Sequence, residues 1–492
     1  MTTHLVVLPI LVLLVAALIL PLVREPRRAS LIGVSALAAA FLLWLALAFL
    51  VMRQGAISYH LGGWPPPVGI EVIADKLAVF FGLTVFLVAI PTAVFAGVDM
   101  PAEAPEPALS SFWTLYLLLV LSLLGLAQAG DLFNMYVFLE ISSLAACALV
   151  AVVNRPANVE AAFKYLLLST VGSGCVLLAI ALLYMITGQL NLAFLARELE
   201  HQAPLYPKNV IGAGTFLLVG LGVKAAIFPL HTWLPDAHAS APSPASALLS
   251  GLVVKVYVVV MVRIVWGTLG RAFFTLLPFK SVLLLLATIS IFLASILAMA
   301  QTDLKRMLAY STVAQMGYIF LGLAAGSRTA FAGAILHIFN HALLKGALFL
   351  AAGAVIWRTG RRRLAELVGV GHTCPLTLSF FAIAALGMVG IPGTSGFVSK
   401  WFLLVGMLQQ SSPLLAWVVL ISSLLNAAYY FPVIILGFFG HGTDNELRFH
   451  LDRIPPELLL PAGSLALVSL FFGLWPSFPL HLAQDIAHDF FL

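Results

Sequence analysis

The sequence predicts an all-α, polytopic membrane protein with about 14 transmembrane helices in a single domain over residues 1–492. Two observations lead to this fold class. Hydrophobic residues make up 62% of the chain and charged residues only 9%, whereas soluble domains carry about 25% charged residues. The apolar residues also form runs of membrane-spanning length along the whole chain.

A transmembrane helix needs about 20 apolar residues, and fourteen stretches of the chain satisfy this requirement. They lie near residues 4–23, 30–52, 76–98, 110–129, 131–153, 163–187, 209–229, 244–268, 277–300, 307–326, 329–357, 376–409, 413–439 and 457–475. The first run is too long for the apolar region of a signal peptide and has no basic segment before it, so we expect a retained span.

Basic residues in the connecting loops predict the orientation. The net charge of +5 is small and falls mostly in loops, so it indicates membrane orientation and not a nucleic-acid partner. Twelve Lys and Arg residues fall on one side, including Arg448 and the cluster Arg358–Arg363, against seven on the other. Cytoplasmic loops carry the excess of Lys and Arg. We therefore expect a protein of the cell membrane with both termini extracytoplasmic.

Three segments between or within the spans have distinctive turn residues. The loop Tyr59–Asp75 combines turn residues with a short alternating stretch, which predicts an extracytoplasmic hairpin. The apolar runs are interrupted at Pro229 and within Gly387–Lys400, which contains Pro392. Interrupted helices free backbone groups that only a protein interior or a wet cavity tolerates. Two such breaks are typical of transporters built from inverted repeats.

Ionisable residues inside the apolar runs are the main functional signal, because one charge at the bilayer centre costs about 3 kcal/mol on insertion scales. Seven such residues lie in five different runs: Glu140, Lys224, Lys255, His337, His341, Lys345 and Lys400. Three of them, His337, His341 and Lys345, are spaced four residues apart and share one helix face. Asn340 lies close to that face.

This set predicts a proton relay in the plane of the membrane. In a low-dielectric environment a carboxylate keeps a lysine charged, and loss of that partner favours release of the proton. Glu140 and Lys224 are the candidate switch and Lys400 the candidate exit; Lys255 and the three residues on one face lie between. Each residue alone has a simpler interpretation, as a polar group satisfied in the core or a side chain that reaches the membrane surface.

Other polar residues near the runs have less specific interpretations. Lys164, Lys305 and Arg306 lie near predicted span ends, as does Asp303, where long side chains reach water. Asp131 fits a helix N-cap. A further group follows the break at Pro229 and either lines an ion entrance or caps the broken helix; it comprises His231, Asp236 and His238.

The sequence gives no sign of a cofactor, a metal or a catalytic centre. The three cysteines, Cys147, Cys175 and Cys374, lie far apart and have no metal-ligand spacing. No nucleophile–base set or phosphate-binding loop is present. We therefore expect no cofactor and no enzymatic chemistry of the chain's own, although a redox-driven parent complex would make it part of a translocase.

Five motifs resemble the antiporter-like membrane subunits, a family that spans respiratory complex I, membrane-bound hydrogenases and Mrp-type multisubunit cation/proton antiporters. The motifs are GDLFNMYVFLEISSLAA (130–146), GVKAAIFPLHTWLPDAHASAPSPASALLSGLVVK (222–255), TDLKRMLAYSTVAQMGYIF (302–320), LHIFNHALLKGALFL (336–350) and GIPGTSGFVSKW (390–401). The resemblance implies 14 transmembrane helices with broken helices 7 and 12. It also implies inverted five-helix repeats, over residues 109–268 and 276–440.

The resemblance also implies roles for the membrane-embedded residues. Glu140 falls on the family's fifth-helix glutamate, and Lys224 on the seventh-helix lysine that this glutamate partners. Lys255 falls on the eighth-helix lysine. The eleventh-helix relay corresponds to His337, His341 and Lys345. Lys400 falls on the twelfth-helix terminal site, where some complex I subunits have a glutamate.

Within this family, the loop Tyr59–Asp75, the GFVSKW motif and the chain length look most like the D subunit of an Mrp-type antiporter. Only 17 residues follow Trp475, which argues against the complex I subunit with a long lateral helix and the largest Mrp subunit. We therefore expect a hetero-oligomeric assembly with other membrane subunits, transporting H⁺ and Na⁺ (or K⁺). The alternatives are a proton-pumping subunit of a complex I-like or hydrogenase-like machine, and a membrane scaffold that transports nothing.

Overall fold

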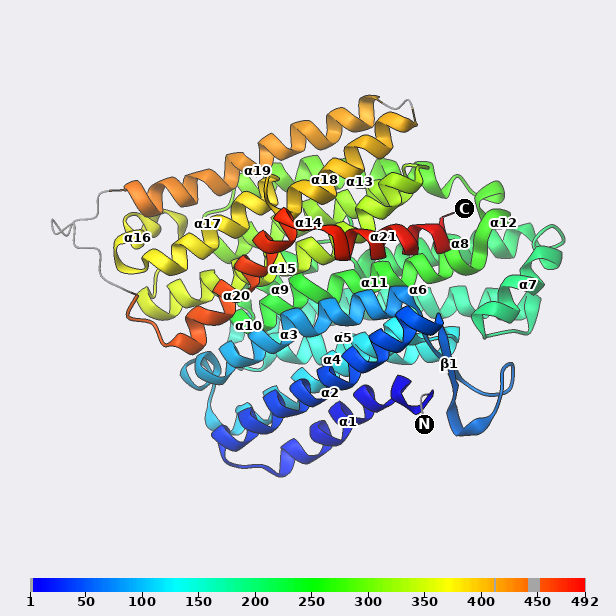
Figure 1. The fold of residues 1–492 in the computed structure, drawn as a ribbon, viewed down its shortest axis with the longest axis horizontal. Helices are drawn as coiled ribbons and strands as arrows, with labels where there is room; N and C mark the ends of the chain where they lie inside the picture. Colours follow the sequence, from blue (N-terminus) through cyan, green and yellow to red (C-terminus); the bar gives the residue numbers. More distant parts are fainter. Residues whose placement is uncertain (1–2, 411–412, 441–451, 492) are drawn as a thin grey trace.

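A computed structural model describes residues 3–410, 413–440 and 452–491 of the chain. Arg448, one of the twelve basic residues that predict the cytoplasmic side, lies outside the described residues. Long helices lie side by side and form an elongated bundle, with α1 and α2 at one edge and α19 at the opposite edge (Figure 1). Helices suit this apolar sequence because each satisfies its own backbone hydrogen bonds without water.

The helices of the first half include a short surface helix, α7. Their bounds are α1 Leu8–Ile19, α2 Pro26–Gln54, α3 Lys76–Glu103, α4 Glu106–Gln128, α5 Leu132–Ala151, α6 Pro156–Thr187, α7 Leu192–Gln202, α8 Pro207–Lys224 and α9 Trp233–Ser240. The predicted cap is confirmed, since the Asp131 carboxylate accepts hydrogen bonds from the amides of Phe133 and Asn134, both at 2.9 Å. These bonds satisfy amides that lack a partner within α5.

The helices of the second half pack around the long helix α15. Their bounds are α10 Ser243–Leu248, α11 Val254–Met261, α12 Gly270–Leu276, α13 Phe279–Met299, α14 Leu304–Ala324, α15 Arg328–Thr359, α16 Val370–Thr373, α17 Pro375–Val389, α18 Ser395–Gln409, α19 Pro413–Phe439, α20 Pro456–Leu474 and α21 Ser477–Phe490. The last helix, α21, continues from the end of α20 towards the end of the bundle where α12 lies (Figure 1), and there Lys76 at the start of α3 pairs with Asp485 at 2.8 Å.

Eleven helices of the described chain are long and apolar enough to cross a membrane, and two shorter apolar helices, Leu8–Leu22 and Pro375–Val389, accompany them. The predicted runs 209–229 and 376–409 are not single long helices, because each is interrupted. A polytopic helical membrane protein is therefore the observed architecture. The count of 14 spans and the repeats 109–268 and 276–440 stay predictions.

The hairpin predicted from Tyr59–Asp75 is present, and its extracytoplasmic location stays a prediction. Strand β1 (Ile57–His60) pairs antiparallel with β2 (Glu71–Ala74), with His60 opposite Glu71. The hairpin projects from one end of the bundle (Figure 1). It is fixed there because the Glu71 carbonyl accepts a 3.1 Å hydrogen bond from the Gly130 amide, and its carboxylate one of 2.7 Å from Asn191.

Both helix interruptions occur where the sequence predicts them. Helix α8 ends at Lys224 and α9 begins at Trp233. The Trp233 indole donates a 2.8 Å hydrogen bond to the Val223 carbonyl oxygen in the last turn of α8, which also accepts one from the Ala226 amide at 3.1 Å. The second interruption separates α17 from α18, with Gly390 at φ +90° and Gly393 at φ +88°. Glycine adopts these left-handed conformations without the steric penalty of a Cβ atom.

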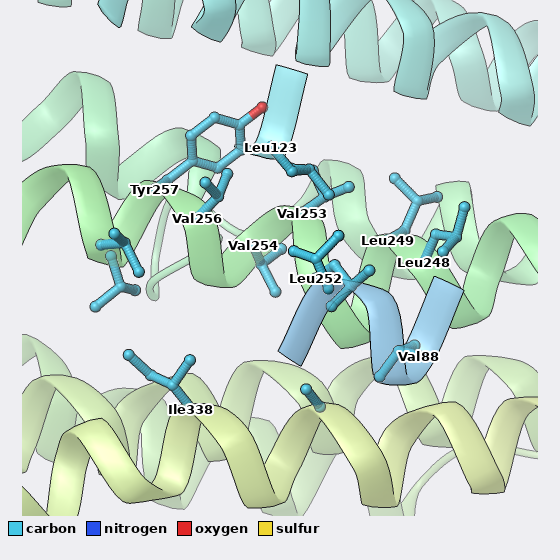
Figure 2. Packing of buried hydrophobic residues seen from close by; sticks show 14 of the residues in the cluster. Val88, Leu123, Leu248, Leu249, Leu252, Val253, Val254, Val256, Tyr257 and Ile338 are labelled. Atoms are coloured by element: carbon cyan, nitrogen blue, oxygen red, sulfur yellow. The ribbon is translucent and has the colours of Figure 1, made fainter. Parts of the chain in front are cut away.

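The centre of the bundle is a continuous helical stretch, Ser243–Leu269, together with α15. Two π-helical segments, η4 (Leu249–Val253) and η5 (Val262–Leu269), widen the turns of that stretch, and such π segments are frequent at functional sites. Figure 2 shows its side chains packed between Val88 of α3, Leu123 of α4 and Ile338 of α15. Polar groups on these two central helices are therefore surrounded by protein and not by lipid.

Candidate functional site

The first predicted pair, Glu140 and Lys224, is brought together from α5 and the end of α8. The Lys224 side chain is 1% exposed, and its ammonium nitrogen lies 3.9 Å from Glu140 Oε1. The same ammonium donates hydrogen bonds to Ser143 Oγ at 2.6 Å and Ser169 Oγ at 3.0 Å. It also lies 5.7 Å from the Tyr257 ring centroid. Lys224 therefore has one ionic partner, Glu140, beyond hydrogen-bond distance, and two serine hydroxyls within hydrogen-bond distance.

Glu140 lies on the outer side of α5. Its side chain is 31% exposed, and it shares that side with the exposed residues Phe133, Val137 and Leu144. Its Oε1 atom is buried and has no hydrogen-bond partner in the described part of the chain. The carboxylate thus reaches inward to Lys224 from the surface of this chain.

Lys255 is fully buried in α11, directly after the π-helical segment η4. Its ammonium donates to the carbonyl oxygen of Ser250, five residues earlier. The Ser250 hydroxyl lies 2.7 Å from that of Thr312 on α14. Within the residues that the structure describes, no carboxylate forms an ion pair with Lys255. Only neutral oxygens therefore stabilise its charge.

The predicted shared face of α15 is present and fully buried. His337 Nδ1 lies 2.8 Å from Ser399 Oγ on α18, and its Nε2 lies 3.0 Å from Gln315 Oε1 on α14. The His341 ring is nearly parallel to the His337 ring, with centroids 5.8 Å apart. Neither nitrogen of His341 has a hydrogen-bond partner among the described residues. Lys345 is the next residue on this face, four positions on.

Lys345 and Lys400 are both buried and bound by oxygens. Lys345 donates to the Leu308 carbonyl at 2.7 Å and to the Ser311 hydroxyl. Lys400 donates to the carbonyls of Met388 at 2.8 Å and Val389 at 3.1 Å. Those two carbonyls are the last of α17, where a helix carries partial negative charge. The second interruption therefore supplies the site that holds Lys400.

Tyr318 of α14 links Lys400 to the shared face of α15. The Lys400 ammonium lies 4.7 Å from the Tyr318 ring centroid, and the Tyr318 and His337 ring centroids are 5.7 Å apart. The structure thus brings Glu140 together with Lys224, and brings His341, His337 and Lys400 together through Tyr318. Lys255 and Lys345 each bind oxygens of their own surroundings. Sequence reasoning missed the hydroxyl and amide side chains that contact these residues, because serine, tyrosine and glutamine are common in helices of this kind.

The three residues after the first interruption occupy different environments. Asp236 is paired at the surface with Lys164 at 3.2 Å and Arg306 at 2.8 Å. His231 is buried and stacks on Phe228, with ring centroids 5.1 Å apart. His238 is fully buried. An ion entrance lined by His231, Asp236 and His238 stays a prediction. No three His, Cys, Asp or Glu side chains of the described chain are grouped as metal ligands would be.

Lys305 corrects an expectation from the sequence. It lies at the start of α14, where a lysine was expected to extend to water, yet its side chain is only 4% exposed. Its ammonium instead donates a 2.6 Å hydrogen bond to the carbonyl oxygen of Ala241. Lys164 and Arg306, by contrast, are nearly half exposed. The direction of Lys305 depends on the packing of α14 against the segment after α9, which a local sequence pattern does not encode.

Known proteins share the sequence pattern and the fold of this chain. Residues 129–426 match the family described as NADH:quinone oxidoreductase/Mrp antiporter, TM. The N subunit of the NADH-quinone oxidoreductase of Desulforudis audaxviator is 41% identical, over 96% of each chain. The D subunit of the Na⁺/H⁺ antiporter of Alkalihalophilus pseudofirmus is 31% identical, over 96% of this chain and 94% of that protein. A chain of the membrane-bound sulfane sulfur reductase, an archaeal respiratory membrane complex, superposes with a TM-score of 0.89 at 30% identity, covering 99% of this chain and 97% of that one.

Proposed function

The chain belongs to the NADH:quinone oxidoreductase/Mrp antiporter family, and we propose that it is the proton-translocating subunit of a multisubunit Na⁺/H⁺ antiporter. The observation that carries the proposal is the Lys224–Glu140 pair at 3.9 Å. It stands at one end of a series of buried protonatable residues that ends at Lys400. Such intramembrane series are typical of proton pathways in pumps and transporters.

The proposed mechanism starts at the Glu140–Lys224 pair. While Glu140 is close, its negative charge stabilises the Lys224 ammonium. When the carboxylate turns outward, only Ser143 and Ser169 remain as partners of that ammonium, and it passes a proton towards Lys255. Tyr257, two residues after Lys255 on α11, contacts the first pair: its hydroxyl is 2.9 Å from Ser142 on α5, and its ring centroid is 5.7 Å from the Lys224 ammonium.

The second half of the route follows α15. Lys345, His341 and His337 present protonatable groups along one face, and Tyr318 lies between His337 and Lys400. A proton that arrives at Lys400 leaves when another positive charge reaches the series, because like charges disfavour one another in a low-dielectric interior. Release at Lys400 resets the series for the next proton.

The two interruptions support the proposed inverted repeats over 109–268 and 276–440, with 14 spans in all. Lys224 is the last residue of α8. The Lys400 ammonium binds the last two carbonyls of α17. A lysine thus accompanies the C-terminal end of the half-helix before each break, where the helix dipole favours a cation.

The outer side of α5 supports a hetero-oligomeric assembly with other membrane subunits. Glu140 is partly exposed there beside Phe133, Val137 and Leu144, and a carboxylate that faces lipid is costly. A neighbouring subunit that covers this side would remove the cost. By the positive-inside rule we further propose a cell-membrane location with both termini extracytoplasmic.

A second candidate function is a proton-pumping subunit of a complex I-like NADH dehydrogenase or a membrane-bound hydrogenase. The specific observation in its favour is the 41% identity to the N subunit of an NADH-quinone oxidoreductase. The same relay would then be driven by redox subunits. The Glu140–Lys224 pair would serve either function. The identity of the other subunits in the complex therefore distinguishes the antiporter from the redox-driven pump.

Purification of the native complex, followed by assay in inverted vesicles, tests the proposal. The antiporter predicts copurifying hydrophobic subunits without redox centres, and collapse of ΔpH on addition of Na⁺ or K⁺. Iron–sulfur subunits with quinone- or hydrogen-driven proton pumping would establish the second candidate. A complex that moves no protons under either condition, and that tolerates neutralisation of Lys255 and Lys400, would instead be a scaffold.

A further inference from the structure

Lys305 is buried where the proposed relay does not use it. Its ammonium is held by the Ala241 carbonyl at 2.6 Å and lies 3.5 Å from Ser243 Oγ. Ala241 belongs to the turn between α9 and α10, and Ser243 is the first residue of α10. A neutral pair of oxygens is a weak environment for a buried charge. Four other charged groups act on Lys305 electrostatically. They are Glu103, Arg362, Asp99 and Asp303.

Asp99 is the buried acidic residue on the other side of this turn. It lies in the last part of α3 and is 1% exposed, and its Oδ2 atom has no hydrogen-bond partner in the portion of the chain that is described. The charges that act on it are those of Glu103 and Lys305. Glu103, one turn further, ends α3 and is only partly buried. An unpartnered carboxyl oxygen deep in the protein lowers stability, so Asp99 is a candidate for a functional role.

Three helices converge between Asp99 and Lys305. A Cβ atom at Gly353 of α15 would lie 2.5 Å from the Cβ of Ser243 and 3.1 Å from the Phe95 ring. Phe95 is on α3, one turn before Asp99. Side chains of α3 and α10 therefore meet α15 at one point, beside the serine that Lys305 approaches at 3.5 Å. Asp99 lies one turn along α3 from the Phe95 ring at this point.

His238 connects this point to the proposed relay. Its ring is fully buried and stacks on Phe349 of α15 at 5.0 Å, and neither ring nitrogen has a partner within the described residues. The Lys345 ammonium lies 5.9 Å from the same Phe349 ring. Lys345, Lys305 and Lys255 are the positive charges that act on His238. These positive charges favour the neutral imidazole, so His238 accepts a proton only when one of the lysines has released its own.

We propose that Glu103, Asp99 and Lys305 form a proton-conducting branch that supplies His238 and Lys345 from the end of α3. The Lys305 ammonium protonates neutral His238, which passes the proton to Lys345 after Lys345 has released its own proton into the relay. A proton taken up at Glu103 moves to Asp99 and from there to the Lys305 amine, so that each group returns to its starting state. Water bridges the gaps between such groups. The branch rests on the proposed function, because it feeds the same relay.

A purely structural role for Lys305 is the competing explanation. In that case the ammonium only holds the turn after α9 through the Ala241 carbonyl. The turn has a second tether, since Arg362 donates to the Ala239 carbonyl and pairs with Asp303. The variant Lys305→Arg separates the two roles: a guanidinium keeps the charge and the hydrogen bonds but does not release a proton in proteins.

The test compares Asp99→Asn, Asp99→Glu and Lys305→Arg in the native complex in inverted vesicles. We expect proton transport to fall at least tenfold in Asp99→Asn and Lys305→Arg, with unchanged copurification of subunits. Asp99→Glu should recover part of the loss, because it restores a carboxyl group. The matched control is Glu106→Gln, an exposed carboxylate of the same acidic segment, which should transport normally.

Two outcomes would overturn the branch. One is full transport in both Asp99→Asn and Lys305→Arg; the other is full transport in Lys305→Arg with loss in Lys305→Ala, which would show a structural role. If Asp99→Asn does not assemble, Lys305→Arg decides alone. Glu140→Ala in the same vesicles separates the two hypotheses. If Glu140→Ala is inactive while the Asp99 and Lys305 variants transport normally, only the branch is wrong. If Glu140→Ala transports normally, the proposed function itself is wrong.

Discussion

Lys400 Nζ lies 3.1 Å from the carbonyl oxygen of Val389, the last residue of α17. The adjacent Met388 carbonyl is a second acceptor at 2.8 Å. The helix interruption therefore creates the acceptor group that a buried lysine requires. This relationship makes the second break part of the proposed proton route and not a packing irregularity.

A substitution of Lys400 by arginine should separate charge from proton release. Lys400→Arg keeps a cation for the freed carbonyls but does not deprotonate, so we expect proton transport to fall at least tenfold while the complex assembles. Lys400→Met should lose transport and also stability, since the buried Val389 carbonyl loses its donor at about 1–3 kcal/mol, while the Met388 carbonyl keeps Asn426 at 3.3 Å. Vesicle transport and thermal unfolding of the purified complex measure the two effects. Wild-type transport by Lys400→Arg would contradict a role in proton release.

The second break should be sensitive to a single methyl group. At Gly390, φ is +90° and an added Cβ would lie 3.0 Å from Lys400 Cδ. Gly390→Ala should therefore destabilise the protein by about 1–2 kcal/mol through left-handed strain alone, and lower transport by displacing Lys400. The matched control is Gly174→Ala on α6, where an added Cβ meets nothing within 4 Å and alanine favours the helix. Equal thermal unfolding temperatures for the two variants would refute the argument.

The hydroxyl partners of Lys224 should matter as much as its ionic partner. A hydrogen bond to a charged group contributes about 1.5–3 kcal/mol, so Ser143→Ala or Ser169→Ala should slow transport tenfold or more. Ser35→Ala on α2 is the control, because that hydroxyl bonds only to carbonyls of its own helix within the described structure. Initial rates of proton movement in vesicles are the measurement. Serine variants as active as the control would show that the hydroxyls do not participate.

Local features of the fold were predictable from the sequence. The cap at Asp131, the hairpin after Tyr59 and the breaks at Pro229 and Pro392 follow from the backbone preferences of single residues. The shared face of His337, His341 and Lys345 follows from the helical period. These features need no knowledge of which helices are neighbours.

Features that depend on tertiary packing were not predictable in the same way. Ser143 and Ser169 contact Lys224 only because α5, α6 and α8 meet there. Lys305 turns inward because α14 packs beside the turn after α9. The pairing of Glu140 with Lys224 could only be hypothesised from their charges and the family resemblance, since 84 positions separate them (224 − 140). Helix phase and neighbour identity are set by the whole bundle.

The most direct test of the proposed switch is proton transport by Glu140→Ala and Lys224→Ala in vesicles that contain the native complex. We expect that both variants assemble normally and that transport is abolished in each, because the pair at 3.9 Å acts as one switch. Subunit copurification establishes assembly. Full transport in both assembled variants would contradict the central claim.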